Sequence, residues 1–286
     1  MAVQPYLDTI SEAGLKPFVA TSEANLKGLD LSVFGGQEII RLLESAEHRN
    51  FHEAYLVSNS LGFGNPDLKM ANWVYIDCVL MQTAVIGFCL PVDLAPRGLL
   101  TLYEDDPYVD TKKLDYIPVS GQISALNITG EEMTGFSLFS LRRLLDQMTL
   151  PKLGVLTKYV ALKSLRADRM KRFLGLSQYD NRALPIHARF APEMQIIQPV
   201  MPLHPLRDMS FIYAMTPDLD ENRVFSDDWP DQPEPDFLLK ADDGPAKHRM
   251  IQDIAKNTRF DILPPVHIEK QDGIYLPVRQ REKHGA

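Results

Sequence analysis

Asp77 is the first residue along the chain whose type and surroundings point to chemistry. It interrupts an otherwise apolar run, residues 73–81, that is rich in β-branched and aromatic side chains. Burying a carboxylate costs free energy unless the group is paired or functional, so a buried Asp77 is a candidate catalytic base. The alternative, which we favour from the sequence, places Asp77 on the polar face of a half-buried strand.

Two histidines offer a second kind of chemistry. His48 and His52 are four residues apart, with Glu44 near them, at the far end of a helix expected over residues 36–54. At this spacing both side chains lie on one helix face and can ligate a metal ion. The spacing supplies no third ligand. We therefore interpret the pair as a solvated helix end and expect no metal site.

A helix expected over residues 154–170 offers a place for an anion. The first turn of a helix leaves backbone N–H groups unpaired and carries a partial positive charge, which suits a phosphate group. Gly154 stands where the preceding loop would turn close to such a group. The alternative is that Gly154 only breaks the loop and that the basic residues of the helix form a solvated face: Lys158, Lys163, Arg166 and Arg169.

Composition limits the classes of protein to which the chain can belong. Of its 286 residues, 45% are hydrophobic and 24% are charged, which are ordinary values for a globular protein with a sizeable core. The net charge of −8 argues against general nucleic-acid binding, so we expect no nucleic-acid partner. Cys78 and Cys89 lie in apolar runs, which indicates two reduced core thiols and no disulfide framework.

The sequence predicts neither a secretory signal nor a membrane span. Residues 1–14 lack a basic segment followed by an apolar one. The most apolar window, residues 73–90, approaches the length of a membrane helix, but Asp77 interrupts it. Two buried strands with a tight turn explain this window better. We therefore expect a cytoplasmic protein.

The hydrophobic pattern predicts an α/β (α+β) fold with a mixed, largely antiparallel central sheet flanked by helices. We expect one domain over residues 1–217, and an acidic, proline-rich excursion with a C-terminal extension, residues 218–286, that packs on it. Asp272-Gly273 predicts a hairpin turn. Besides two helices, over residues 154–170 and 248–257, we expect these strands: 55–57, 73–81, 84–92, 99–103, 116–128, 135–141, 172–180, 194–203 and 209–215.

From residue 135 the chain reads GFSLFSL, then LPKLGVLTKYVALKSLRADRM, then RFLGLSQYDN and RALPIHARF. This block resembles the cofactor-binding half of the GNAT-type N-acyltransferases. In that family a strand leads into a pyrophosphate loop of pattern Gln/Arg-x-x-Gly-x-Gly/Ala, followed by a helix, a strand and a second helix of pattern Asn-x-x-Ala-x-x-x-Tyr-x-x-x-Gly-Phe. Gly154 matches the last glycine of the loop, and the final pattern is matched in part by Asn181, Ala183, His187 and Phe190.

The chain departs from the family pattern at several positions. Lys152 stands where the first loop glycine is expected, and Thr149 where the Gln or Arg is expected. Asn181 is one residue too close to the following alanine, and His187 replaces the tyrosine. Pro185 lies inside the expected second helix. Since proline is tolerated only in the first turn of a helix, we expect this helix to begin near residue 184.

The resemblance implies transfer of an acyl group from an acyl-CoA thioester, the cosubstrate, to an amine or similar nucleophile of a small molecule. The pantetheine arm would lie between two diverging strands, and a backbone N–H would stabilise the oxyanion. His187 would reprotonate the departing thiolate, because the ordinary pKa of histidine suits acid–base work. Tyr179 is the second choice for this acid, and Asp77 is the candidate base. The cofactor-binding positions would be Leu141, Lys152, Gly154, Val155 and Asn181.

Two other functions stay open. The incomplete loop pattern favours a non-catalytic α/β binding or regulatory protein. Long apolar strands favour a hot-dog-type thioester enzyme, in which a sheet wraps a central helix. In each case we expect a small-molecule ligand, no metal and no membrane span, and we consider a homodimer as the assembly.

Overall fold

Strands and helices alternate along most of the chain. The computed structural model describes residues 3–43, 45–63, 72–77, 83–126, 131–145, 148–202, 204, 206–229 and 231–282. Contacts group the chain into unit 1, Met1–Thr129 with Gly135–Arg169, and unit 2, Gly130–Thr134 with Met170–Ala286. In both units most strand pairs are antiparallel and helices flank the strands, which confirms the predicted mixed α/β class. The division into a domain over 1–217 and an extension over 218–286 stays a prediction.

In unit 1 the strand order is β5-β4-β3-β1-β2. β3 pairs antiparallel with both β1 and β4, whereas β2 runs parallel to β1. Every residue of β3 except the last is buried, because helices cover both faces of this sheet. The strands are β1 Lys16–Thr21, β2 Ile40–Leu43, β3 Ala84–Pro91, β4 Tyr116–Leu126 and β5 Glu132–Ser140.

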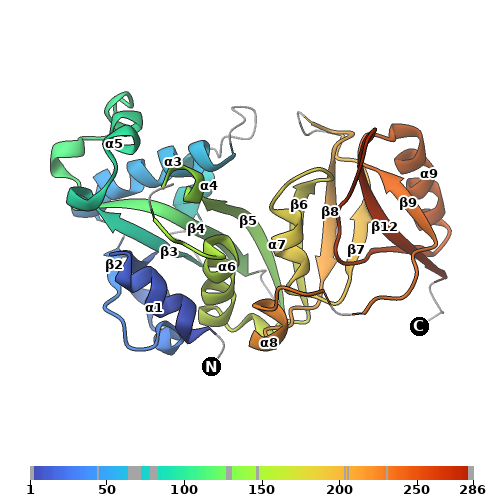
Figure 1. Ribbon diagram of the computed structural model, residues 1–286, viewed down its shortest axis with the longest axis horizontal. Coiled ribbons are helices and arrows are strands. Elements are labelled where there is room, and N and C mark those ends of the chain that lie inside the picture. The colour runs from blue at the N-terminus through green and yellow to red at the C-terminus, as the bar shows by residue number, and fades with distance from the viewer. Residues whose placement is uncertain are drawn as a thin grey trace. The chain divides into compact units, whose positions relative to one another are not determined.

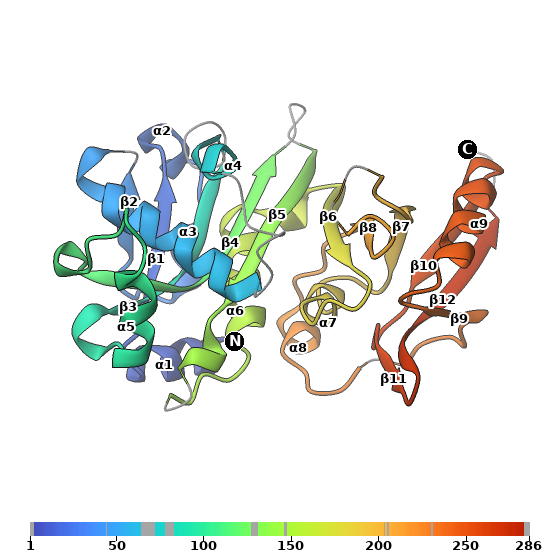
Figure 2. The same cartoon turned by 90° about the horizontal axis from the view of Figure 1, so that it is seen from above.

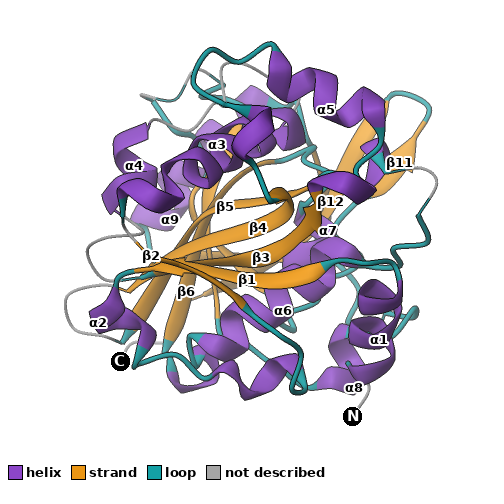
Figure 3. Cartoon of the chain, turned by 90° about the vertical axis from the view of Figure 1, so that its left-hand side faces the viewer, coloured by secondary structure: helices purple, strands orange, loops and turns teal. Residues whose placement is uncertain are grey.

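The helices of unit 1 lie on the two faces of its sheet. Figure 3 shows α3 and α4 on one face and α1 and α6 on the other. α3 packs on β4, and α6 packs on β3 and β4. The helices are α1 Gln4–Glu12, α2 Glu23–Leu26, α3 Arg49–Phe63, α4 Asn72–Asp77, α5 Arg97–Glu104 and α6 Leu153–Ser164.

In unit 2 the strand order is β6-β8-β7-β10-β12-β11, and β9 also pairs with β12. α9 lies along β10 and β12 (Figure 1, Figure 2). The strands are β6 Arg172–Gln178, β7 Met194–Gln198, β8 Ser210–Met215, β9 Phe237–Lys240, β10 Thr258–Ile262, β11 Ile268–Lys270 and β12 Gly273–Glu282. The helices are α7 Leu184–Ala188, α8 Glu221–Val224 and α9 Gly244–Ala255.

The first residues of β5 belong to unit 2, where they lie beside the start of β6. The N–H of Lys171 donates to the carbonyl of Glu131 at 2.8 Å, and Arg172 pairs with Glu132 at 2.7 Å. From Gly135 onward the residues of β5 belong to unit 1. The first part of β5 thus belongs to unit 2 and the second part to unit 1.

Several predicted elements are confirmed. The long strands β3, β4, β5 and β6 have the expected positions, as does β8, whereas β7 ends at Gln198 and is shorter than the strand predicted over 194–203. The short helix α7 begins at Leu184, with Pro185 in its first turn, as the restriction on proline requires. Asp272-Gly273 makes the hairpin between β11 and β12, where Lys270 pairs with Gly273. Cys89 is buried in β3, and Cys78 lies outside the described residues.

Three predicted strands are wrong, because short apolar runs do not distinguish a strand from a helix. Residues 55–57 belong to α3, the described part of 73–81 forms α4, and residues 99–103 belong to α5. The helix predicted over 36–54 is also wrong in part, since residues 40–43 form the edge strand β2 and α3 begins only at Arg49.

Aromatic contacts with α3 explain why the apolar residues of α4 are helical. Tyr75 is 3% exposed and stacks on Tyr55 of α3, with ring centres 4.9 Å apart. Its neighbours Trp73 and Ile76 are 66% and 49% exposed. Tyr75 therefore anchors α4 to α3 by stacking on Tyr55 and by the contact of its hydroxyl with His52.

Candidate functional site

Lys152 has an unusual backbone conformation directly before α6. Its φ is 53° and its ψ is 27°, in the left-handed region that glycine adopts freely and that strains other residues. Lys152 is also the position at which the family pattern expects the first loop glycine. The backbone is therefore glycine-like here although the side chain is lysine. The Lys152 Nζ lies 5.7 Å from the centre of the Tyr6 ring.

The N-terminus of α6 presents backbone donors. The first intrahelical bond runs from the N–H of Leu156 to the carbonyl of Lys152, at 2.9 Å. The N–H groups of Leu153, Gly154 and Val155 therefore have no partner within the helix. Within the described part of the chain, no side chain caps this end. These donors and the positive end of the helix dipole together provide the chemistry of an anion site.

Leu141 lies at the other end of the loop that leads to α6. Its N–H donates to the carbonyl of Val119 at 2.8 Å, and its own carbonyl accepts from the N–H of Leu144 at 2.8 Å. The side chain is 2% exposed. Both backbone groups and the side chain of Leu141 are thus occupied within unit 1, and its proposed contact with a cofactor stays a prediction.

The solvated basic face expected for this helix is wrong at Lys158, whereas Arg166 and Arg169, which follow α6, are exposed. Every residue from Leu153 to Ser164 except Lys163 is buried, because α6 packs on β3 and β4 and also on the short helical segment Leu31–Phe34. Lys158 is 0% exposed, and burial lowers the pKa of its ammonium well below the ordinary value. Thr157 fastens the helix to the sheet through a 2.7 Å hydrogen bond from its Oγ1 to Ser120 Oγ.

Asp77 is the last residue of the helix α4, and the strand predicted around it does not form there. The interpretation of Asp77 as the polar face of a half-buried strand is therefore wrong. Its role as a base stays a prediction.

Near α4, His52 lies half-buried, with 2.5 Å between its Nδ1 and the Tyr75 hydroxyl. The solvated helix end expected for His52 is wrong, and burial lowers its pKa.

Tyr179 directly follows β6 and is fully buried. Its hydroxyl donates to the carbonyl of Pro199 at 2.9 Å, and its ring stacks on Phe211 with centres 4.2 Å apart. Burial raises the pKa of this phenol. Because its proton is already held by a carbonyl oxygen, Tyr179 is poorly suited in this state to give a proton to a substrate.

His187 lies on the short helix α7 and is half-buried. Its ring centre is 5.7 Å from that of Tyr213, which continues the row of aromatic rings from Phe211. The acidic segment after residue 217 is fastened to the same helix. Arg223 pairs with Asp218 at 2.5 Å and donates to the carbonyl of Ala188 at 3.4 Å. The start of this acidic segment is thus held against α7.

Asn181 has a local role in the turn before α7. Its side-chain oxygen accepts from the N–H of Ala183 at 2.8 Å, and its side-chain nitrogen donates to Gln178 at 3.2 Å. Such bonds are typical of an Asx turn. The contact with a cofactor that the family pattern implies for Asn181 stays a prediction.

Two residues that sequence reasoning missed surround Tyr179. Lys247 of α9 is 1% exposed, and its Nζ donates to the carbonyls of Asp208 and Ala241, at 2.6 and 2.5 Å. The same Nζ lies 4.3 Å from the centre of the Tyr179 ring. His267 places its Nε2 2.8 Å from the carbonyl of Tyr179. No sequence signal could place them beside Tyr179, because Tyr179 lies far from both along the chain.

The sequence-predicted residues fall into two sets. Unit 1 holds Asp77, Leu141, Lys152, Gly154 and Val155, and unit 2 holds Tyr179, Asn181 and His187. Among the described residues, no group of three or more His, Cys, Asp or Glu side chains could hold a metal ion. In the same part of the chain, no helix has the length and apolar character needed to cross a membrane.

Comparison with known proteins assigns no family. No protein-family model matches the chain, and no curated protein matches it.

Proposed function

We propose that this protein transfers an acyl group from an acyl-CoA thioester to a small-molecule amine or similar nucleophile. The observation that carries the proposal is the glycine-like backbone of Lys152 at the start of α6. It occurs in the order of elements that the acyltransferase pattern has: the strand β5, a loop, α6, the strand β6 and the short helix α7.

The loop before α6 is the proposed anchor for the pyrophosphate of CoA. Three backbone N–H groups at the helix N-terminus would donate to phosphate oxygens, and the helix dipole favours negative charge there. A lysine in place of the first loop glycine adds a positive charge while it keeps the backbone turn. This substitution would raise affinity for an anion, at the cost of a strained residue.

His187 is the proposed general acid. In the reaction, the amine nitrogen attacks the thioester carbonyl carbon, the C–S bond breaks, and the thiolate takes a proton from the imidazolium of His187. The amine loses a proton to a base, for which Asp77 is the candidate. His187 is preferred to Tyr179 because the Tyr179 proton is held by the carbonyl of Pro199.

A non-catalytic binding protein is the second candidate function. The burial of Tyr179 and its hydrogen bond to Pro199 favour it, since they remove one of the two proposed acids. The hot-dog alternative is less favoured. It requires one sheet wrapped around one helix, whereas helices lie on both faces of the unit 1 sheet (Figure 3).

Thermal unfolding with CoA and acetyl-CoA tests the proposal. A ligand that binds only the folded chain stabilises it by mass action, by about 2.7 kcal/mol at one hundred times the dissociation constant. We expect the midpoint to rise by several degrees with either compound, and the rise to shrink in Lys152→Glu, which reverses the charge at the anchor. The proposal fails if millimolar CoA and acetyl-CoA both leave the midpoint unchanged.

The same titration with His187→Ala separates catalysis from binding. The shift in the unfolding midpoint with CoA should persist in this variant. The rate of acyl transfer to amines, measured as release of free CoA thiol, should fall by about 10²-fold or more. Full turnover in His187→Ala would remove this residue from the mechanism. A shift with CoA but no transfer by the unmodified chain would instead support the non-catalytic candidate.

A further inference from the structure

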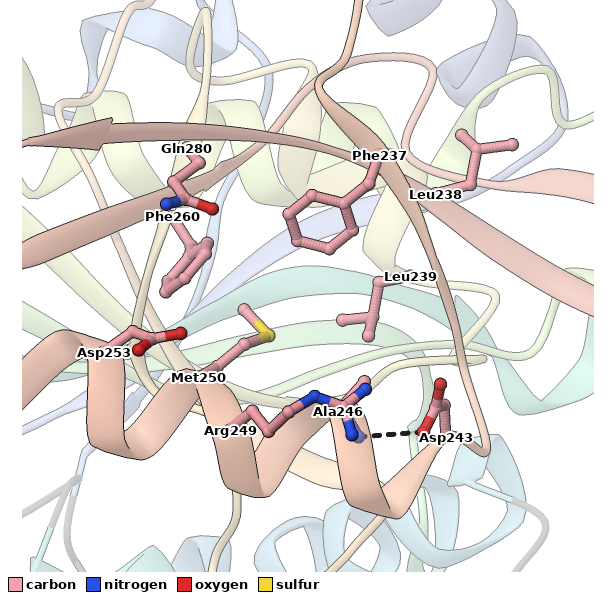
Figure 4. A pocket seen from close by; sticks show the side chains of 10 residues that line it. All are labelled: Phe237, Leu238, Leu239, Asp243, Ala246, Arg249, Met250, Asp253, Phe260 and Gln280. Atoms are coloured by element: carbon pink, nitrogen blue, oxygen red, sulfur yellow. Dashed lines mark hydrogen bonds between the residues drawn. The ribbon is translucent and has the colours of Figure 1, made fainter.

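A groove in unit 2 offers a binding site that is independent of the proposed transferase chemistry. Figure 4 shows it between α9 and the strands β9, β10 and β12. Its volume is about 300 Å³. This volume is at the small end for ligand pockets and suits one aromatic ring with a short chain. All of its lining residues belong to unit 2.

The floor of the groove is apolar. Phe237 and Leu239 alternate along β9 and point to the face that α9 covers, and Phe260 joins them from β10. Met250 rises from α9 between them. The rings of Phe237 and Phe260 meet edge to face, with centres 6.2 Å apart. A floor of this kind binds an apolar body of a ligand by removing it from water.

The rim of the groove carries unused charge. Asp253 and Arg249 are four residues apart on α9, a spacing at which opposite charges often pair. Across the described ranges, neither forms an ion pair or a side-chain hydrogen bond. Asp253 lies at the end of the groove near Phe260 and Gln280, whereas Arg249 extends along α9 toward Ala246 (Figure 4). Asp243 caps α9 through a 2.8 Å bond from the N–H of Ala246.

We propose that this groove binds a small organic cation, an aryl- or alkyl-ammonium compound. The lining includes two carboxylates, of Asp243 and Asp253, and one guanidinium, of Arg249, so the rim has an excess of negative charge. The ammonium group would be held by Asp253 and by the side-chain oxygen of Gln280. The apolar body would lie on the floor, where aromatic faces also attract cations.

Three probes with the same ring test the charge selection: 2-phenylethylammonium, 2-phenylethanol and 3-phenylpropionate. Binding to the full chain is measured by calorimetry and by NMR shifts, without CoA, so that the result does not depend on the transferase proposal. We expect the ammonium probe to bind about tenfold more tightly than the carboxylate probe, with the alcohol between them. Equal affinities, a preference for the carboxylate, or no binding of the ammonium probe at millimolar concentration would overturn the proposal.

Variants locate the site. Asp253→Asn should weaken the ammonium probe several-fold, and Arg249→Gln should strengthen it, because it removes a like charge. The matched control is Asp242→Asn, which removes the same charge from an exposed residue that does not line the groove. Met250→Trp should fill the groove and abolish binding, with circular dichroism to confirm folding. An equal loss in Asp242→Asn and Asp253→Asn would overturn the assignment to this groove.

Discussion

At the scale of single residues, Lys152 is the most informative position in the chain. A non-glycine residue in the left-handed region costs about 1–2 kcal/mol and persists only where the surroundings fix it. Here the residue joins the loop to a helix that is buried on nearly all sides. The packing of α6 therefore fixes the turn, and the turn aims the helix N-terminus.

Replacing Lys152 by glycine tests the conformational cost. Lys152→Gly removes the left-handed strain, and the greater freedom of glycine in the unfolded chain offsets part of the gain, so we expect stabilisation of about 0–1 kcal/mol. The matched control is Lys163→Gly in the same helix, where right-handed backbone makes glycine about 1 kcal/mol worse. Chemical unfolding measures both. Destabilisation of similar size in the two variants would contradict the backbone assignment.

At the scale of elements, α9 serves two surfaces. The side chains of Ala246, Met250 and Asp253 line the groove. Lys247 instead lies over the Tyr179 ring and donates to the carbonyls of Asp208 and Ala241. The ammonium of Lys247 is buried, and burial lowers its pKa. Since two carbonyls and one aromatic ring surround this group, it fixes α9 in place and is not free to react.

Lys247→Met should destabilise the chain by about 2–3 kcal/mol. The substitution keeps much of the side-chain volume but leaves the buried carbonyls of Asp208 and Ala241 without their donor, and hydrogen bonds to charged groups are the more valuable ones. Lys256→Met, at the exposed C-terminal end of α9, is the control and should change stability by less than about 0.5 kcal/mol. Guanidinium unfolding measures the stability of both variants. Equal destabilisation by Lys247→Met and Lys256→Met would refute the proposal that Lys247 fixes α9 in place.

At the scale of the whole molecule, each unit contains partly buried histidine. Burial lowers the pKa of His52 in unit 1 and of His204 and His267 in unit 2. Between the lowered value and the ordinary value of 6.5, the unfolded chain binds more protons than the folded chain. The free energy of unfolding therefore falls as pH decreases through this window, and the loss ends below the folded-state pKa.

Urea unfolding at several pH values from 7.5 down to 5 tests this expectation. The stability of the unmodified chain should fall toward acid, and the fall should be smaller in His267→Gln, which keeps an N–H donor for the carbonyl of Tyr179 but cannot titrate. His248→Gln, at an exposed position on α9, serves as the control. An unchanged pH dependence in His267→Gln would show that this histidine does not couple protonation to folding.

Elements with strong local signals are predictable from the amino-acid pattern alone. Apolar runs of strand length predicted strands over 84–92, 116–128 and 172–180, and strands form at 84–91, 116–126 and 172–178. Pro185 determined the start of α7, since its ring excludes a longer helix, and Asp272-Gly273 determined the hairpin between β11 and β12. These signals act within a few residues, so no distant contact is needed to predict them.

Burial of individual side chains and contacts between distant elements become visible only in the folded chain. Residues 72–77 form a helix whose Tyr75 stacks on α3, and packing of α6 buries Lys158 where the sequence predicts a solvated basic face. Lys247 donates to the carbonyls of Ala241 and Asp208, which are six and thirty-nine residues away along the chain. The groove on α9 likewise joins three strands with one helix. Burial and long-range pairing are properties of the assembled core, which local pattern and spacing do not contain.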